Sequence, residues 1–186
     1  MIAVRWIVWC ATLAAVVKLD VPGPEPRVDA AAAIGLALAA AVALFAALAR
    51  LRVRPLVPRR AHRSAAARLG LHFSARAAYE EAVWRGLVLG PTSGALGAAP
   101  GLAVSTLGFA ASHVGTQGRR AAAHLLTGAT FGSLYLATGH LLAAVLAHAA
   151  YDVLVTAAAV ADGTWPVRTI GRGRAAAYDR AEEGAR

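Results

Sequence analysis

The sequence predicts an all-α, polytopic membrane protein with about six transmembrane helices in one bundle and a polar site inside the membrane. Three observations predict this fold class. Hydrophobic residues make up 58% of the chain and charged residues only 16%, and the mean hydropathy is +0.55, which is unusually apolar for a soluble domain. The apolar residues form long windows without charge, each suited to a membrane span. The basic residues gather between these windows, where they act as topology signals.

The net charge of +9 comes from 19 Lys and Arg against 10 Asp and Glu. A basic chain can bind nucleic acid, but here the positive residues flank apolar segments and suit anionic lipid head groups. We therefore expect membrane lipid as a partner and no nucleic acid. The composition excludes intrinsic disorder, a coiled coil and a disulfide-rich secreted fold, and the single cysteine, Cys10, excludes an intrachain disulfide.

The first half of the chain contains two predicted spans. Trp6–Val17 is apolar but short; a signal peptide is the alternative, yet no convincing small-residue cleavage site follows, so we predict a membrane helix. Lys18–Arg27, with its prolines and glycine, is a loop. Ala30–Leu51 is the clearest span in the sequence. It leads into the arginine cluster Arg50–Arg63, which is the strongest signal for a cytoplasmic loop.

Four more helices are predicted in the second half of the chain. These are Ser74–Leu89, Gly101–His113, Ala121–Thr138 and His140–Ala161. The first of them carries charged residues that a hydropathy scan would reject. Pro91–Pro100, rich in glycine, is predicted to be a turn, and Gly139 alone joins the last two helices.

Six helices of alternating direction would put both termini, Arg50–Arg63 and Arg119–Arg120 on one side of the membrane. Because these regions hold most of the positive charge, the pattern supports counting Ser74–Leu89 as a span. We expect a multi-pass protein of the cytoplasmic membrane with both termini in the cytoplasm. Residues 1–161 form the predicted transmembrane domain, and residues 162–186 a polar cytoplasmic tail.

Ionisable residues within these helices indicate a functional site, because they are costly in a bilayer. Glu81 and Arg85 are four residues apart and can form an ion pair on one helical face. A buried pair of this kind could serve only to fix the helix register. Glu80 is turned about 100° away from Glu81 on a regular helix. We expect Glu80 to remain unpaired and free for chemistry.

Two histidines on other helices complete the constellation. Phe109 and His113 are one turn apart, and so are His148 and Asp152, whose imidazole and carboxylate could hold one water or one metal ion between them. Either histidine alone could be a satisfied core residue. Two of them at a depth similar to that of Glu80 favour a site, with Phe109 packing beside His113. The other four histidines are expected at the membrane interface: His62, His72, His124 and His140.

These motifs resemble those of the CPBP intramembrane proteases, also called the CAAX prenyl protease or abortive-infection family. That family carries Glu-Glu-x-x-x-Arg, Phe-x-x-x-His and His-x-x-x-Asn or Asp on separate membrane helices, and all three occur here in order. Small residues around Gly128–Gly132 and Gly139 also look like a helix pair of the family. The resemblance covers roughly residues 74–155, the expected protease-like core. Asp152 stands where asparagine is more frequent, and the chain is shorter than the eukaryotic members, so their substrate is not carried over.

The resemblance implies an endopeptidase that cleaves a membrane-associated peptide or protein near the cytoplasmic face. Glu80 would activate water, and His113 and His148 would hold it or stabilise the oxyanion. Asp152 would orient His148 or share the water, with Glu81 and Arg85 bracing the helix. Zinc bound by Glu80, His113, His148 and Asp152 and a metal-free glutamate mechanism both remain open.

Two other classes of function are compatible with the residues. A non-catalytic immunity or scaffold protein could retain them for folding. A proton or ion pathway could use the same side chains, although no internal repeat of the transporter type is detectable. The sequence does not indicate the substrate or the oligomeric state.

Overall fold

The computed structural model describes residues 7, 8, 10–12, 14, 23–48 and 63–161, and the regular elements within them are helices. The all-α prediction is confirmed for this part of the chain. Much of the first apolar segment, the arginine-rich residues 49–62 and the tail at 162–186 lie outside the described residues, and so do the predictions made for them. The described elements are α2 (Ala30–Leu48), α3 (Arg63–Glu81), η2 (Ala82–Leu89), α4 (Gly90–Leu96), α5 (Ala98–Gln117), η3 (Gly118–Ala122), α6 (Ala123–Thr138) and α7 (Leu141–Ala161).

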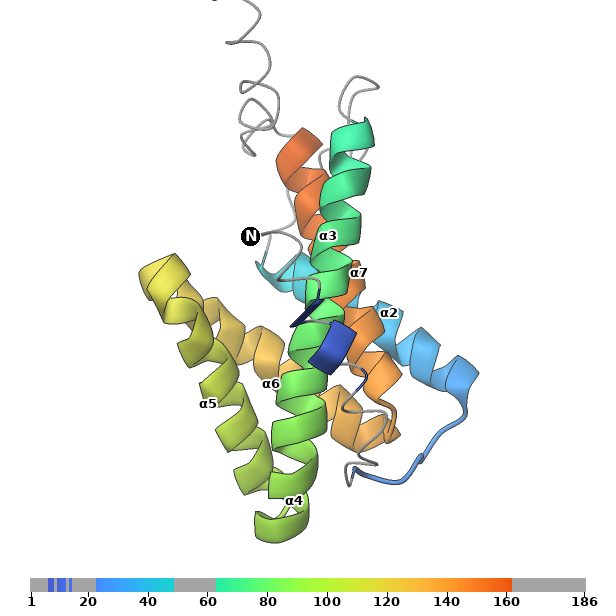
Figure 1. Ribbon diagram of the computed structural model, residues 1–186. Helices are drawn as coiled ribbons and strands as arrows, with labels where there is room; N and C mark the ends of the chain where they lie inside the picture. Colours follow the sequence, from blue (N-terminus) through green and yellow to red (C-terminus); the bar gives the residue numbers. More distant parts are fainter. Residues whose placement is uncertain (1–6, 9, 13, 15–22, 49–62, 162–186) are drawn as a thin grey trace, which may run out of the picture.

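The helices are arranged around α3 and α7, which pack side by side (Figure 1). Helix α2 packs on α7, and α6 packs on both α5 and α7. The contact of α2 with α7 uses buried small residues, among them Ala37 and Ala147, which let the two backbones approach closely. Helices α3 and α4 follow one another through η2, and α5 runs back beside them (Figure 1).

The charged helix predicted at Ser74–Leu89 is longer and less regular than expected. In the described residues it runs from Arg63, and residues 63–73 are rich in alanine, leucine and arginine, which favour helix. From Ala82 to Leu89 the backbone is π-helical, and the N–H of Gly90 bonds to the carbonyl of Arg85. Such segments are rare and frequently lie at functional sites. This one directly follows the glutamate pair.

The chain turns within Pro91–Pro100 as predicted, but most of these residues are helical. Pro91 lies in the first turn of α4, and the hydroxyl of the next residue, Thr92, donates to the carbonyl of Val88 at 2.6 Å. The chain reverses at Gly97, whose φ of 90° is unfavourable for residues with a side chain. Since one glycine makes the reversal, α5 begins at once with Ala98 and continues past His113 to Gln117.

The joint between the last two helices is confirmed at Gly139, which has a φ of 73°. A Cβ at this position would collide with the backbone of Glu25, in the segment that precedes α2. The N–H of Arg27 donates to the carbonyl of Thr138 at 2.9 Å, and the imidazole of His140 bonds to the carbonyl of Val28 at 2.8 Å. The glycine turn therefore ties the α6–α7 pair to α2.

Two of the described helices, α2 and α7, are long and apolar enough to cross a membrane. Helix α6 has 16 residues, fewer than the roughly 20 that a span usually needs. Helix α3 carries charged residues along its length. Two apolar helices of span length are therefore present in the described residues, and about six spans stay a prediction.

Candidate active site

The buried centre of the site is the ion pair between Glu81 and Arg85. Arg85 Nε lies 2.9 Å from Glu81 Oε2, and neither side chain has any exposed surface. Arg85 Nη2 also donates to the carbonyl of Gly128 on α6 at 3.0 Å, and the guanidinium lies 5.0 Å from the ring centre of Phe109. The predicted pair is confirmed, and Arg85 links η2 to both α5 and α6.

The same glutamate orients His148 on α7. Glu81 Oε1 lies 2.7 Å from His148 Nδ1. Because a carboxylate accepts hydrogen bonds, Nδ1 carries a proton and Nε2 is left facing Glu80 and Asp152. Asp152 was predicted to orient His148 or to share its water. The orienting role belongs to Glu81, which thus joins three helical segments.

His113 on α5 is held in the same tautomer by its own helix. His113 Nδ1 lies 2.9 Å from the carbonyl oxygen of Phe109, so Nδ1 donates and Nε2 is left as the acceptor. The ring of Phe109 packs 4.9 Å from that of His113, as expected, and 5.9 Å from that of His148. Phe131 stacks on the other imidazole, His148, at 4.7 Å. Both imidazoles are therefore fixed by hydrogen bonds and aromatic packing.

Glu80 is paired, and the prediction that it is free was wrong. Arg76, one turn earlier on α3, places its Nε 2.5 Å from Glu80 Oε1. The same guanidinium donates from Nη2 to His113 Nε2 at 3.0 Å. Arg76 is a site residue that sequence reasoning missed, although an arginine four residues before a glutamate is the same signal that identified Glu81 and Arg85.

The structure brings together the four residues predicted to carry the chemistry. Glu80 Oε1 lies 3.8 Å from His113 Nε2, and Glu80 Oε2 lies 3.9 Å from His148 Nε2. His148 Nε2 lies 3.7 Å from Asp152 Oδ2. These separations exceed a direct hydrogen bond and suit a bridging water. Glu80 comes from α3, His113 from α5, and the other two from α7.

These side chains face a cavity of about 820 Å³. Arg119 and Arg120 of η3 lie at its exposed edge. His124 was expected at the membrane interface, but it also lines the cavity and stacks on His113 at 3.8 Å. Its position depends on α6 packing against α5, which no local pattern reveals. Further lining residues are Leu48, Phe73, Gln117, Thr127, Tyr151 and Thr156.

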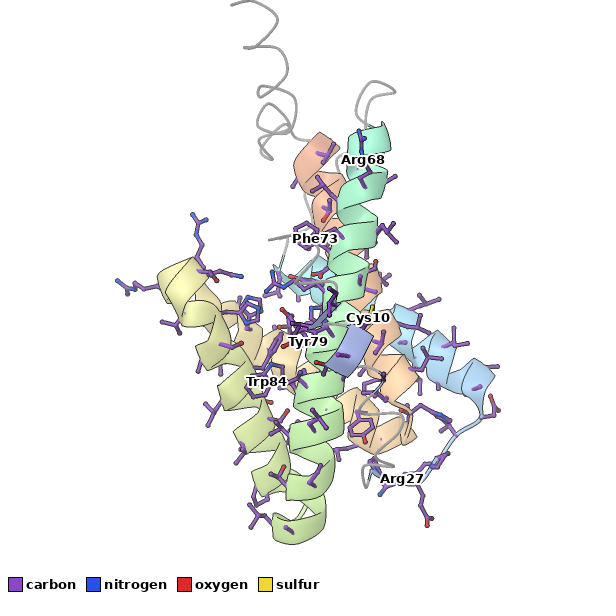
Figure 2. All side chains as sticks on the ribbon, viewed as in Figure 1. Cys10, Arg27, Arg68, Phe73, Tyr79 and Trp84 are labelled. Atoms are coloured by element: carbon purple, nitrogen blue, oxygen red, sulfur yellow. The ribbon has the colours of Figure 1, made fainter. Side chains whose placement is uncertain are left out.

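Glycines on α6 allow the close packing that this site requires. A Cβ on Gly128 would lie 3.0 Å from Phe109 Cδ1, and one on Gly132 would lie 2.5 Å from Leu102 Cδ1. On the other side of α5, the ring of Trp84 fills the space above Gly108, and Figure 2 shows Trp84 pointing from η2 toward α5. The expectation that small residues bring these helices together is confirmed for α6.

The described side chains do not fit a bound divalent metal ion as they stand. Within the described residues, no group of three or more His, Cys, Asp or Glu is arranged to hold one. The Arg76 guanidinium also lies against both Glu80 and His113, and a cation there opposes a second cation. We therefore derive no step through a metal.

Helices that include two of membrane-span length surround a cavity lined by a carboxylate and two imidazoles, which are groups that general acid–base hydrolysis uses. Residues 63–154 match the model of the Rce1-like family, described as type II CAAX prenyl endopeptidase Rce1-like. This segment is similar to a family of membrane proteases, and the resemblance in the motifs is confirmed. No curated protein and no solved structure matches the chain.

Proposed function

We propose that the protein is an intramembrane endopeptidase that hydrolyses a peptide bond of a membrane-associated substrate near the cytoplasmic face. One observation carries this proposal: the carboxylate of Glu80, two imidazoles held in place and Asp152 surround one cavity, with separations of 3.7, 3.8 and 3.9 Å. The similarity to a protease family supports the reaction class.

In the proposed reaction, a water lies between Glu80 Oε2, His148 Nε2 and Asp152. Glu80 takes a proton from this water while the water oxygen forms a bond to the substrate carbonyl carbon. The π electrons of the carbonyl pass to its oxygen, giving a tetrahedral oxyanion. When the C–N bond breaks, the proton on Glu80 passes to the amine leaving group. The oxyanion re-forms the C=O bond, the products are a carboxylic acid and an amine, and Glu80 is again a carboxylate.

In this scheme the two histidines hold the water or stabilise the oxyanion. Each donates its Nδ1–H to a fixed acceptor, the Phe109 carbonyl for His113 and Glu81 for His148. The Nε2 atom of His113 accepts from Arg76, whereas Nε2 of His148 can accept a hydrogen bond from water in the neutral ring and donate one in the protonated ring. Glu81 and Arg85 position the π-helical segment and His148.

The reaction we propose needs no metal, because Arg76 already supplies a positive charge at Glu80. Zinc held by Glu80, His113, His148 and Asp152 is the alternative. It requires Arg76 to move away from the first two ligands. Activity after treatment with 1,10-phenanthroline separates the metal-free reaction from the zinc-dependent one.

We further propose that about six spans enclose the site, with both termini in the cytoplasm. The charges of the α3–η2 segment support this arrangement, because Glu81 and Arg85 are fully buried and Glu80 turns inward to the cavity. In such a span the charged side chains face the interior of the bundle and do not contact lipid. The exposed arginines of η3 would then lie near cytoplasmic head groups.

The proposal is tested by mapping new protein termini in host membranes. A deletion strain would be complemented with wild type, with Glu80→Gln, or with Glu25→Gln, an exposed carboxylate outside the cavity. All three proteins would be compared at matched abundance. We expect termini that appear with wild type and Glu25→Gln and disappear with Glu80→Gln.

Identical maps for wild type and Glu80→Gln, with the biological phenotype intact in both, contradict proteolysis. That outcome supports a non-catalytic immunity or scaffold role in the membrane. An ion pathway predicts instead unchanged maps and a Glu80-dependent membrane current.

A further inference from the structure

The cavity that contains Glu80 is basic at one end and apolar at the other. Its lining includes Arg119 and Arg120 of η3, and also Leu48 of α2 and Val155 of α7. Helices α2 and α7 pack on each other, whereas η3 packs on α5 and α6. Figure 1 shows α5 and α2 on opposite sides of α3. A substrate segment in the cavity therefore meets two cations at one end and hydrocarbon at the other.

Arg119 and Arg120 have no acidic partner in the described part of the chain. Both side chains are exposed. The acidic residues of the site are engaged with other groups: Glu80 with Arg76, Glu81 with Arg85, and Asp152 with His148. The other described acids, Glu25 and Asp29, lie in the segment before α2. The two positive charges of η3 are therefore available to a ligand of the cavity.

The charges of the cavity distinguish acidic from basic substrate segments. Cytoplasmic segments of membrane proteins usually carry lysine and arginine beside their spans, and the η3 arginines repel such residues. An acidic residue deeper in the cavity would be repelled by Glu80 and Asp152, so its favourable place is the η3 end. Specificity arises from repulsion of the wrong ligand as well as from attraction of the right one.

We propose that Arg119 and Arg120 form a subsite that selects substrates with an acidic side chain, Asp or Glu, beside the scissile bond. This inference rests on the proposed endopeptidase function and names its substrate class. A cavity of about 820 Å³ is about 9 Å across if its sides are equal, and about three extended residues span that distance. We therefore expect the acidic residue within about three positions of the cleaved bond. Because the basic end lies on one side of Glu80, the acid should be on the same side of the bond in each substrate.

Anionic lipid is the other ligand that exposed arginines could bind near the head groups. The observation that favours the peptide is that Arg119 and Arg120 line the same cavity as Glu80 and His113. The test therefore begins without anionic lipid, in dodecyl maltoside micelles. It uses the purified full-length protein and peptides that span a junction found by terminus mapping.

Two fluorescence-quenched peptides differ only in Glu or Gln at the acidic position. We expect kcat/KM to be about 3–10-fold higher for the Glu peptide at low salt, because one or two exposed ion pairs are lost with Gln. The ratio should fall toward one in about 1 M salt, where the Debye length is only about 3 Å.

Reversing the charge of the subsite should reverse its preference. In the double variant Arg119→Glu/Arg120→Glu we expect the Gln peptide to be cleaved faster than the Glu peptide, and a Lys peptide faster than both. Each ratio compares peptides on one protein, so a change in the folded fraction cancels. Arg68→Glu, on the exposed surface of α3 outside the cavity (Figure 2), should keep the wild-type ratio.

Several results would overturn the inference while leaving the protease function standing, provided Glu80→Gln is inactive in the same assay. They are equal cleavage of the Glu and Gln peptides by wild type, or a ratio that the double variant leaves unchanged. Mapped junctions without Asp or Glu within about three residues would do the same. So would a loss of activity in the double variant that phosphatidylglycerol vesicles restore equally for each peptide, since this assigns the arginines to lipid. If Glu80→Gln cleaves as fast as wild type, the proposed function falls and the inference falls with it.

Discussion

The buried ion pair gives the sharpest prediction for stability. Arg85→Met removes the guanidinium and leaves Glu81 in a site where neither side chain is exposed. It also removes the hydrogen bond to the carbonyl of Gly128. Breaking a buried pair by deleting one partner costs about 3–5 kcal/mol, because the remaining charge is uncompensated. We expect the free energy of unfolding to fall by this amount.

A double variant shows whether the stranded charge is the cause. Glu81→Gln removes the charge of Glu81 but keeps an oxygen that can accept from His148 Nδ1. Combined with Arg85→Met, it should recover at least about 2 kcal/mol of the loss, because no unpaired charge remains. Arg68→Met, on the exposed surface of α3, should stay within about 0.5 kcal/mol of wild type.

The assay is unfolding by sodium dodecyl sulfate in dodecyl maltoside micelles, followed by tryptophan fluorescence. Trp84 packs against α5 beside the ion pair and reports its environment. The reasoning is refuted if Arg85→Met unfolds within about 1 kcal/mol of wild type, below the cost expected for a buried pair. It is also refuted if the double variant is no more stable than the single one.

Three further predictions concern the metal, His124 and the helix joint. Cleavage of the mapped peptide should persist after treatment with 1,10-phenanthroline, and loss of activity that zinc restores would contradict the metal-free proposal. His124→Ala should slow cleavage by up to about tenfold, because a ring stacked on His113 contributes about 0.5–1.5 kcal/mol; kinetics equal to wild type would show that the stacking is not used. Gly139→Ala should lower the free energy of unfolding by more than about 1 kcal/mol, because φ is 73° and a Cβ meets the Glu25 backbone; an unchanged detergent titration would argue against that strain.

Local spacing was sufficient for several features of the fold and site. The pairing of Glu81 with Arg85 and the packing of Phe109 on His113 follow from residues four apart on a helix. The joint at Gly139 follows from the one residue type that readily adopts a positive φ. Family motifs then indicated which helices must meet, and the structure places Glu80, His113 and His148 around one cavity.

Other features depend on contacts between distant segments. The π-helical backbone after Glu81 is not encoded in a hydrophobic period. Its Trp84 carbonyl accepts a hydrogen bond from Ser105 on α5 at 2.7 Å, and Arg85 donates to the Gly128 carbonyl on α6 at 3.0 Å. His124 reaches His113 through the packing of α6 on α5. The pair of Arg76 with Glu80 was within reach of the sequence, because its spacing is the same as that of Glu81 and Arg85.

The origin of the site in three separate helices bears on how the protein is made. Glu80 and Arg76 emerge from the ribosome on α3, whereas His148 and Asp152 belong to α7, the last described helix. A nascent chain that has not completed α7 already contains Glu80 and Glu81. It still lacks His148, the imidazole that Glu81 orients. The proposed activity therefore arises only after synthesis of the helical domain is complete. Truncated products inserted in the membrane would be inert toward their neighbours.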